Sequence, residues 1–539
     1  MENTDVLIIG GGPTGVVLAL ELAAQKIPFR LIDKALARSD KSRALVVQPR
    51  TLELLSRHGI ARDLQERGFT TTGARYCVNG KEVVRIEVGD NAALPNTAFP
   101  FQKLISQEDT EYFLDECLEK KYGRKVERGL EAKTVVQDAD GVTATFSKVG
   151  DTTGETTTIR AKYVVGCDGS RSVVRQAAGL TFDGESYQQH FILTDTHIEW
   201  EREAPNGEAI MCFGQGVLAV LPLKNGMVRV FASGANVKKR EGEPLLEDFQ
   251  EFFDKMVPVK GKLHDPVWLT RFYLHHRGVN KYSNGRIFVA GDAAHIHSPV
   301  GGQGMNTGIQ DAVNLGWKLA AVIRGERPAS FLDSYHGERY PVGQNLLKST
   351  DRVFNFMSST NPIFVFIRNL LLPWLLPWLF GKMSRVQEMF KVMSEFDITY
   401  RDYGFVGTAP LLRGNNVRGG DRMLDGKIEG PEGQKYLLDL ADPTSYHLIL
   451  LSGFGTEAAS EGDLQRAEAI FMEKSPVTVK VHLIFGEKPN GQSGYVDKDA
   501  TLHKDLGFSQ PTYVLLRPDS YIGHVGPLSA LGDLINWSK

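Results

Sequence analysis

Cysteine is scarce in this chain, whose 539 residues include only four: Cys77, Cys117, Cys167 and Cys212. They stand far apart and form no C-x-x-C pair, so a disulfide framework and a cysteine-based zinc site are both excluded. Because no cysteine follows Cys212, the second half of the chain has no pair of thiols for redox exchange. This pattern fits a reducing compartment, and we expect a cytoplasmic protein.

An excess of charge of one sign is also lacking. The 62 Lys and Arg residues against 65 Asp and Glu residues give a formal net charge of −3, which offers no electrostatic argument for nucleic acid or an anionic membrane. No signal-peptide pattern precedes the first apolar run, which starts within five residues of Met1. The length predicts about two to four domains of a soluble globular protein.

Long hydrophobic runs are absent with one exception, IFVFIRNLLLPWLLPWLF over residues 363–380. The run has about the length of a membrane span, but Arg368 interrupts it and two prolines should break its helix. We expect a short buried helix followed by a kinked apolar elbow, without membrane contact. The alternative is a membrane-surface or partner patch with Trp374 and Trp378 at an interface.

The N-terminus carries a dinucleotide-binding pattern. An apolar run over residues 5–10, typical of a buried parallel strand, leads into GGGPTG. In this G-x-G-x-x-G turn, which also contains Thr14, Gly10 permits a tight turn, Gly12 lets the backbone approach a pyrophosphate, and Gly15 lets the next helix pack closely. The pattern predicts bound nucleotide at the start of that helix.

The residues after the glycines strengthen this interpretation. A helix is expected over residues 16–25, and a second strand over residues 29–32 leads to Asp33, about twenty residues after the glycines, as a ribose-binding acid should be. The alternative is a glycine-rich turn without a ligand. Strand, glycines, helix, strand and acid in this order favour the nucleotide site.

A second glycine-rich segment, GRIFVAGDAAHIHSPVGGQGMNTG, occupies residues 285–308. A strand over residues 287–290 should lead to Asp292, whose carboxylate can bind a ribityl or ribose hydroxyl. The N–H groups after Gly302 and Gly304 can approach a phosphate or a flavin ring, and a helix should begin near Asn306. Together with the N-terminus, this segment favours a flavin enzyme. We expect no metal site, because no acid cluster accompanies its two histidines.

Three motifs stand in a fixed order: GGGPTG at residues 10–15, Cys-Asp-Gly at 167–169 and Gly-Asp at 291–292. In this order the chain resembles the single-component, NAD(P)H-dependent flavoprotein aromatic hydroxylases of the p-hydroxybenzoate hydroxylase superfamily. The match covers residues 1–345. It implies a monooxygenase that hydroxylates an aromatic, phenolic or polyketide-like substrate through a flavin C4a-hydroperoxide, with FAD as cofactor and NADPH or NADH and O2 as co-substrates.

The resemblance also implies which residues contact the cofactor. The FAD contacts are expected at Gly10, Gly12, Thr14, Gly15, Asp33, Arg43, Gln107, Asp168, Asp292, Gly302, Gly304, Met305 and Asn306. Asp168 has an alternative role, which is to cap a helix over residues 170–178. Pro299 lies where the family places a carbonyl near the reacting carbon.

Candidates for substrate contact lie between the two glycine-rich segments. Arg229-Val-Phe231 resembles the Arg-x-Tyr strand of phenol hydroxylases, in which the arginine meets the mobile flavin and the tyrosine touches substrate. Here phenylalanine replaces that tyrosine. Tyr273, on a strand expected over residues 269–277, either lines the pocket or only satisfies the sheet.

Beyond residue 400 the chain resembles the phenol and polyketide hydroxylase branch, whose members append a thioredoxin-like domain. The expected fold is α/β: a Rossmann-like FAD-binding domain, an antiparallel-sheet substrate domain and a C-terminal thioredoxin-like domain. The expected divisions are residues 1–180 and 285–400 for FAD binding, 181–284 for the substrate sheet with a contribution from 76–100, and 401–539 for the last domain.

Other functions stay open on the same fold. Epoxidation and Baeyer–Villiger oxidation are alternatives to ring hydroxylation, and a halogenase or dehydrogenase is a further one, although the W-x-W-x-I-P halogenase signature is absent. A non-catalytic flavin-fold binding protein is the alternative of another class, and Asp33 and Asp292 argue against it.

The expected partners are a small aromatic substrate, NAD(P)H and O2, without nucleic acid. A homodimer remains open.

Overall fold

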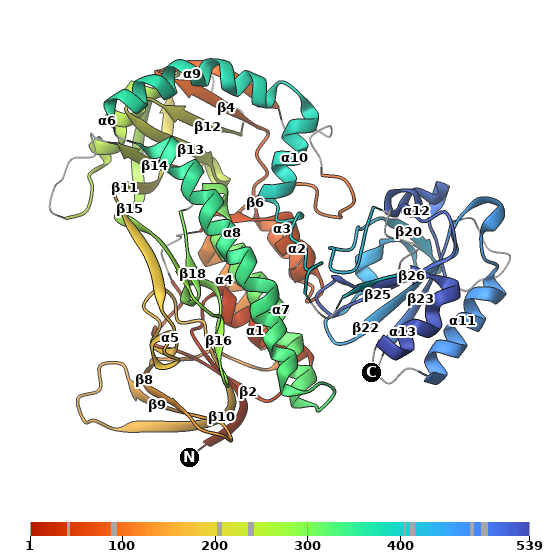
Figure 1. Ribbon diagram of the computed structural model, residues 1–539. Helices are drawn as coiled ribbons and strands as arrows, with labels where there is room; N and C mark the ends of the chain where they lie inside the picture. Colours follow the sequence, from red (N-terminus) through yellow and green to blue (C-terminus); the bar gives the residue numbers. More distant parts are fainter. Residues whose placement is uncertain are drawn as a thin grey trace.

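Three large sheets organise the chain in the computed structural model (Figure 1). The structure describes residues 2–39, 44–87, 94–201, 207–234, 242–298, 300–359, 361–403, 406–409, 416–474, 479–486 and 494–537. Each large sheet contains eight strands, and a small two-stranded sheet joins β3 (Val46–Val47) to β6 (Lys103–Leu104). In Figure 1 the C-terminal sheet lies to one side of the other two.

The first sheet is built on the N-terminal apolar strand. Its main path runs through β16 (Ser283–Asn284), β17 (Ile287–Val289), β10 (Thr156–Gly166), β1 (Glu2–Ile9), β2 (Phe29–Asp33) and β7 (Glu127–Arg128). Its parallel pairs are β1 with β2 and β10, β10 with β17, and β2 with β7. The hairpin of β8 (Leu130–Gln137) and β9 (Val142–Lys148) extends from β10. The carboxyl ends of these parallel strands therefore lie at one edge, where α/β sheets bind nucleotides.

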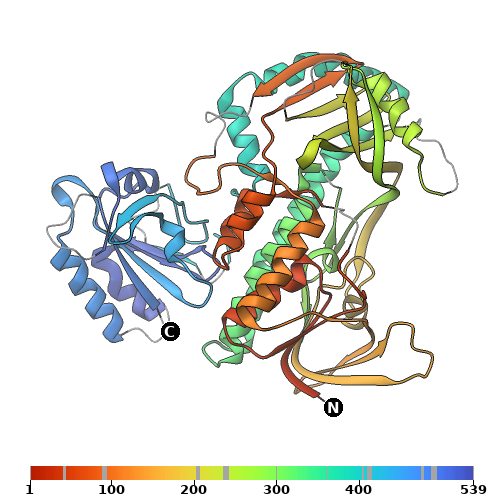
Figure 2. The ribbon, with the colours of Figure 1, turned by 180° about the vertical axis from the view of Figure 1, so that it is seen from behind.

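Helices cover this sheet, and those predicted over residues 16–25 and from about Asn306 are among them. The helices that follow its strands are α1 (Pro13–Ala24), α2 (Pro49–Ser56), α3 (Ala61–Arg67), α4 (Gln107–Tyr122), α5 (Val173–Ala177) and α7 (Gly304–Ile323). α1 starts earlier than expected because Pro13 occupies its first turn, where a missing N–H costs nothing. α1 packs against α7 and α4, and the orange α4 lies in front of the green helices in Figure 2. α7 is buried along most of its length.

The second sheet stands above the first in Figure 1. Its order is β18 (His295–Ile296), β15 (Gly261–Val279), β11 (Phe182–Trp200), β14 (Met227–Gly234), β13 (Gly216–Pro222), β12 (Glu208–Phe213), β4 (Gly73–Val78) and β5 (Lys81–Glu87). The expectation of an antiparallel sheet is correct for every pair except β4 and β12, which run parallel. They can do so because β4 enters from the first sheet, far from β12 in sequence.

Different helices cover the two faces of the second sheet. α6 (Leu246–Met256) packs its phenylalanines against Val228, Val230 and Ala232 of β14. Successive strand residues alternate between faces, so Arg229 and Phe231 face the other way. There Phe231 meets the cluster containing Phe354 of α8 (Asp333–Ser358).

The apolar run over residues 363–380 differs from its prediction. It forms one uninterrupted helix, α9 (Pro362–Phe380), with Pro373 and Pro377 inside it, and α10 (Met383–Met393) follows. The helix is mostly exposed, so the expected short buried helix with a kinked elbow is wrong. Only one narrow stripe, Arg368, Leu372 and Leu376, is buried.

The third sheet contains the C-terminal residues. Its order is β19 (Gly407–Thr408), β26 (Ile522–Pro527), β25 (Thr512–Leu516), β22 (Tyr446–Leu451), β23 (Val479–Phe485), β24 (Tyr495–Val496), β20 (Lys427–Gly430) and β21 (Gly433–Tyr436). Its helices are α11 (Glu461–Lys474), α12 (Thr501–Leu506) and α13 (Leu531–Trp537). β22 and β23 are parallel with α11 between them in sequence, and β25 and β26 form an antiparallel pair before α13.

A buried ionic cluster joins this third sheet to the rest of the chain. Arg517 donates two hydrogen bonds to Glu338 of α8, at 2.7 and 2.8 Å, and binds Asp519 beside it. Lys318 of α7 also binds Glu338, at 2.8 Å. Burial lowers the pKa of Lys318 to about 8, against the opposing effect of Glu338. On the other side, Arg50 of α2 donates to the backbone oxygen of Asp519.

Arg517→Met should destabilise the protein by about 3–5 kcal/mol, because it leaves buried carboxylates without a partner of opposite charge. Urea unfolding measures the loss. The matched control is Arg62→Met, which breaks the exposed pair of Arg62 and Glu66 and should change the free energy of unfolding by under about 0.5 kcal/mol. Equal, small losses in both variants would contradict a stabilising role for this cluster.

Candidate FAD site

The two glycine-rich segments meet at Thr14 in the first turn of α1. A Cβ atom added to Gly291 or to Gly308 of α7 would lie 2.6 Å from the Thr14 Oγ1 atom in either case. Gly308 would also approach the Cα atom of Gly291 to 3.1 Å. Side chains at these positions would force the segments apart. The fold thus brings the N-terminal turn and the Gly-Asp loop to one place.

Each glycine of the N-terminal turn has the environment that its expected role requires. Gly10 has φ +114°, and a Cβ atom there would lie 2.1 Å from the Cys167 carbonyl oxygen. A Cβ atom on Gly15 would lie 1.9 Å from the Gly10 carbonyl oxygen, which explains the close packing of α1. A Cβ atom on Gly12 would meet nothing within 4 Å. That open space at a helix N-terminus suits a pyrophosphate.

Asp33 ends β2 directly beside this turn. Its carboxylate accepts hydrogen bonds from the backbone N–H groups of Gly11 and Ala35. These bonds fix the acid next to the open space at Gly12. The placement is the one expected for an acid that binds a ribose hydroxyl.

The loop before α7 is tied to the strand β3. Asn306 accepts a hydrogen bond from the Gln48 N–H and donates to the carbonyl oxygens of Val46 and Gly302. Gln48 in turn donates to the Gly301 carbonyl oxygen at 2.8 Å. The side-chain amide of Asn306 is thus engaged by the backbone. Asn306 therefore fixes the shape of the loop.

Gly302 needs to be a glycine, and α7 begins close to the residue predicted for its start. Gly302 has φ +63°, and a Cβ atom there would approach Val46 to 2.8 Å. α7 begins at Gly304, two residues before the expected start. Met305 is partly buried and packs against the core of the first sheet.

Asp311 of α7 fixes the Gly-Asp turn through hydrogen bonds. Asp311 accepts hydrogen bonds from the Gly291 N–H at 3.1 Å and from Arg339 at 2.7 Å, and it binds His295 at 2.7 Å. Burial opposes ionisation of Asp311, but Arg339 and His295 hold its pKa below the usual range. Asp292 itself is exposed at the turn. A fixed turn that presents an exposed carboxylate suits a sugar or ribityl hydroxyl.

His297 offers a buried acceptor at the same loop. Burial lowers the pKa of His297 to about 4, so the imidazole is neutral near pH 7. Its Nδ1 lies 2.7 Å from the Ser298 carbonyl oxygen and therefore carries the proton. Its buried Nε2 has no partner among the described residues, and a Cβ atom on Gly304 would lie 3.4 Å from it. Buried polar atoms seldom lack partners, so a group outside the chain fits here.

The remaining expected FAD residues are placed in different ways. Gln107 begins α4 and accepts a hydrogen bond from the Ala44 N–H, beside the segment that contains Arg43. Arg43 itself and Pro299 lie outside the described residues. Asp168 accepts hydrogen bonds from Ser172 and from the N–H groups of Val173 and Val174, so it caps α5. The alternative role of Asp168 as a helix cap is therefore present.

Arg229 is buried in the second sheet and paired with Asp195, which the sequence analysis did not select. Its Nε and Nη2 atoms donate to the two oxygens of Asp195 at 2.7 and 2.8 Å. Trp268 Nε1 donates to the same carboxylate at 2.9 Å. Among the described residues, nothing accepts from the buried Arg229 Nη1. A cross-strand partner has no local sequence signal, which is why Asp195 was missed.

Tyr273 is not brought together with Arg229. Phe272 and Leu274 belong to the aromatic cluster on the Arg229 face, and alternation along β15 places Tyr273 on the opposite face. Its side chain is 55% exposed, and its ring lies 5.1 Å from that of His190. The structure thus separates Tyr273 from Arg229.

Glu395, which follows α10, is a second residue that the sequence analysis missed. It binds Thr307 Oγ1 at 2.6 Å and Gln310 Nε2 at 2.5 Å, both in the first turns of α7. Burial raises the pKa of Glu395 to about 8, although the Thr307 hydrogen bond opposes this. Its partners lie more than 80 residues away in sequence, so no local motif reveals it. Glu395 positions the start of the helix that carries the glycine loop.

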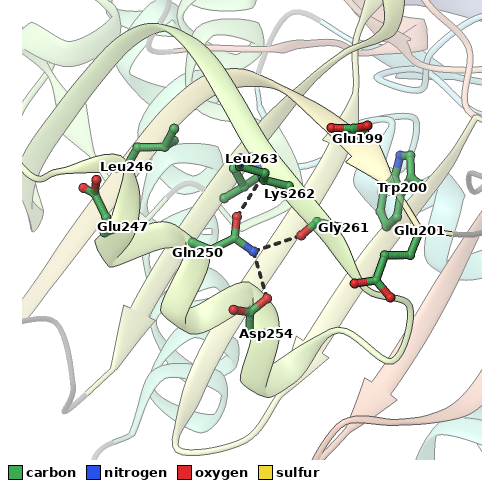
Figure 3. Close-up of a pocket in the computed structure, with 10 residues that line it drawn as sticks. All are labelled: Glu199, Trp200, Glu201, Leu246, Glu247, Gln250, Asp254, Gly261, Lys262 and Leu263. Carbon is green, nitrogen blue, oxygen red and sulfur yellow. Dashed lines mark hydrogen bonds between the residues drawn. The ribbon is translucent and has the colours of Figure 1, made fainter.

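A pocket of about 600 Å³ lies elsewhere, between α6 and the ends of β11 and β15 (Figure 3). It contains none of the expected site residues. The polar atoms of Gln250 at its centre bind Asp254, the Gly261 carbonyl oxygen and the Leu263 N–H. The bonds to Gly261 and Leu263 hold α6 to the sheet, and neither glycine-rich segment lines this pocket.

Comparison with known proteins agrees with the geometry. A family described as an FAD binding domain matches residues 3–350. Pentachlorophenol 4-monooxygenase of Sphingobium chlorophenolicum is 31% identical over 542 residues, with 98% of this chain and 95% of the relative covered. 6-Methylpretetramide 4-monooxygenase of Streptomyces rimosus is 30% identical, with 98% of this chain and 92% of the relative covered. The solved structure of OxyS anhydrotetracycline hydroxylase from Streptomyces rimosus has a TM-score of 0.72, 26% identity and 99% coverage of both chains.

The chain therefore belongs to this FAD-binding family, and it is an FAD-dependent monooxygenase of the aromatic-hydroxylase class. The described residues fit FAD, because Gly12 leaves open space, Asp292 is exposed and His297 presents an unpaired acceptor.

Replacing Glu395 should change how stability depends on pH. Its folded-state pKa of about 8 lies above its ordinary value of 4.5, so its contribution to stability is complete below pH 4.5 and is lost as the pH rises through 8. Glu395→Gln keeps both hydrogen bonds without a charge. Relative to that variant, the wild type should lose on the order of several kcal/mol between these pH values, at about 1.4 kcal/mol per pKa unit.

Urea unfolding at a series of pH values checks this expectation. Glu388→Gln is the control, because Glu388 lies exposed on α10 and should give the wild-type pH profile. Parallel profiles for wild type and Glu395→Gln would rule out a protonated Glu395 in the folded protein.

Proposed function

We propose that this monooxygenase hydroxylates a fused, multi-ring aromatic compound that carries phenolic or carbonyl oxygens, with NADPH or NADH and O2 as co-substrates. The observation that carries the proposal is the pair of unpartnered donors on the Arg229 face of the second sheet. Arg229 Nη1 and Ser233 Oγ are both buried and have no partner among the described residues. Oxygen atoms of a bound compound would satisfy them.

The side chains between these donors are aromatic and pack together in a buried cluster. Phe231 lies midway between them on β14, and its ring lies 5.6 Å from that of Phe191 and 6.2 Å from that of Phe272. Flat aromatic rings pack favourably against such side chains. A site of this composition favours a flat, largely apolar compound with polar atoms at its edges.

The spacing of the donors favours several rings over one. Arg229 and Ser233 are four residues apart on one strand, or about 13 Å at about 3.3 Å per residue. A single phenol ring is too short to reach both donors, whereas a fused tricyclic or tetracyclic system is long enough. The relative named for 6-methylpretetramide is consistent with this proposal.

In this mechanism FAD, once bound and reduced, supplies the activated oxygen. The residues of the chain hold FAD and the aromatic substrate. The Gly301–Met305 loop presents backbone N–H groups, and Asn306 and Glu395 fix its shape. Arg229, with one side neutralised by Asp195, keeps a free N–H for a substrate oxygen. The aromatic side chains around Phe231 exclude water from the reacting ring.

The expected division of the chain belongs to the same proposal. We assign FAD binding to residues 1–180 and 285–400, and substrate binding to 181–284 with a contribution from 76–100. We assign a thioredoxin-like unit to residues 401–539, supported by the spatial order β23-β22-β25-β26. Since it contains no cysteine, its proposed role is structural. We also propose a cytoplasmic location.

NAD(P)H oxidation, O2 uptake and product mass measured together test this function. With FAD-loaded protein, hydroxylated fused-ring aromatics should give a kcat/KM at least about tenfold above that of single-ring phenols, which corresponds to about 1.4 kcal/mol. Ser233→Ala should remove most of that advantage without affecting single-ring phenols. Ser349→Ala is the control, because its hydroxyl donates to the Leu346 carbonyl oxygen within the same helix, α8.

Two results would contradict the proposal. Conversion of an aromatic substrate without O2 uptake would refute monooxygenation. Equal or better turnover of single-ring phenols would refute the assignment of a multi-ring substrate while leaving the monooxygenase activity intact.

A further inference from the structure

α9 packs against the second sheet through one narrow stripe. Leu372 and Leu376 join the core formed with Val78, Phe213 and Val217. Arg368, one turn earlier, donates to the carbonyl oxygens of Gly214 and Met357. These contacts fix the helix to the sheet, so its position on the outside of the molecule is part of the fold (Figure 1).

The rest of α9 exposes large apolar side chains. They are Ile363, Phe364, Phe366, Ile367, Leu370, Leu371, Trp374, Leu375 and Trp378, and Trp374 is 80% exposed. The helix is also long and apolar enough, by length and composition, to cross a membrane. A helix that is apolar all round is normally covered by protein or lipid, and contiguous exposed apolar patches mark interaction sites. The FAD chemistry requires no such surface.

The charges that flank α9 in the sequence indicate what covers it. From residue 352 to residue 387 the sequence contains Arg352, Arg368, Lys382 and Arg385 and no aspartate or glutamate. Arg368 is buried, Arg352 is exposed on α8 ten residues before α9 begins, and Lys382 and the half-buried Arg385 follow the end of α9. A second copy of the chain packed through the same face would bring only further cations from this segment. An anionic lipid surface complements them.

The two tryptophans fit the same partner. Trp374 and Trp378 lie one turn apart near the C-terminal end of α9, and both are exposed. The Arg385 guanidinium lies 4.1 Å from the centre of the Trp378 ring. Indole rings and arginines with apolar stems concentrate at the boundary between lipid tails and headgroups. This end of the helix therefore combines an apolar body with a cationic rim.

We propose that α9 docks the enzyme on an anionic lipid surface, with the helix axis in the plane of the membrane. Its 19 residues extend about 28 Å at 1.5 Å per residue, and the exposed side chains enter the boundary between headgroups and tails. The helix lies on the surface without spanning the bilayer, because Arg368, Leu372 and Leu376 hold one side against the sheet. This replaces the expectation that the chain makes no membrane contact.

Vesicle flotation of the full-length, FAD-loaded protein tests the proposal. The wild type should float with vesicles of phosphatidylcholine and phosphatidylglycerol, and at least about tenfold less with phosphatidylcholine alone. Leu371→Gln/Trp374→Gln should lower the bound fraction at least about tenfold on anionic vesicles. Lys382→Gln/Arg385→Gln should remove the preference for anionic lipid. Retained FAD absorbance and circular dichroism verify that each variant is folded.

Val136→Gln/Val267→Gln is the matched control, because these valines are 64% and 65% exposed on β8 and β15; it should bind vesicles as the wild type does. The proposal is overturned if the wild type remains unbound with both vesicle types. It is also overturned if sedimentation velocity shows a dimer that Leu371→Gln/Trp374→Gln dissociates while vesicle binding is absent, since the occupant is then a second copy.

Discussion

The FAD site depends on one close approach of backbone segments, that of Gly308 in α7 to Thr14 and Gly291. Because Gly308 and Gly291 carry no side chains, both pack directly against Thr14, and the first turn of α1, the Gly-Asp turn and α7 form one unit. The same helix carries Asn306, which shapes the glycine loop, and Asp311, which holds the Gly-Asp turn. A single buried helix thus sets the relative positions of the two motifs that a dinucleotide requires.

Farther along, α7 connects the site to the rest of the molecule. Thr307 and Gln310 bind Glu395 after α10, and Lys318 joins the ionic cluster of Glu338, Arg517 and Asp519. Such buried charges are costly to leave unpaired, so they specify how the C-terminal sheet packs against α7 and α8. The C-terminal residues therefore support the helix that bears the FAD loop without contributing redox chemistry.

The sequence predicted those elements that depend on residues close to one another in the chain. The strand that ends at Asp33, the glycine turn at residues 10–15 and the helix that follows this turn could be predicted from periodicity and backbone freedom within a few residues. Contacts between residues far apart in sequence could not be predicted. Examples are the pair of Asp195 and Arg229 and the contact of Glu395 with α7. α9 was predicted incorrectly because two prolines were expected to end a helix that remains continuous, and because exposure depends on tertiary packing. Arg43 and Pro299 remain predictions.

A comparison of two alanine variants of α7 tests the central claim that the contact at Gly308 assembles the FAD site. A Cβ atom on Gly316, two turns farther along, would lie 2.6 Å from Glu21 Cβ, as close as the Gly308 Cβ to Thr14. Both variants strain the packing of α7 on α1, but only Gly308→Ala does so at the two motifs. Titration of apoprotein by quenching of FAD fluorescence should show Kd raised at least about tenfold for Gly308→Ala, or about 1.4 kcal/mol, and less than about threefold for Gly316→Ala. Equal weakening in both variants, or wild-type affinity in Gly308→Ala, would contradict the account.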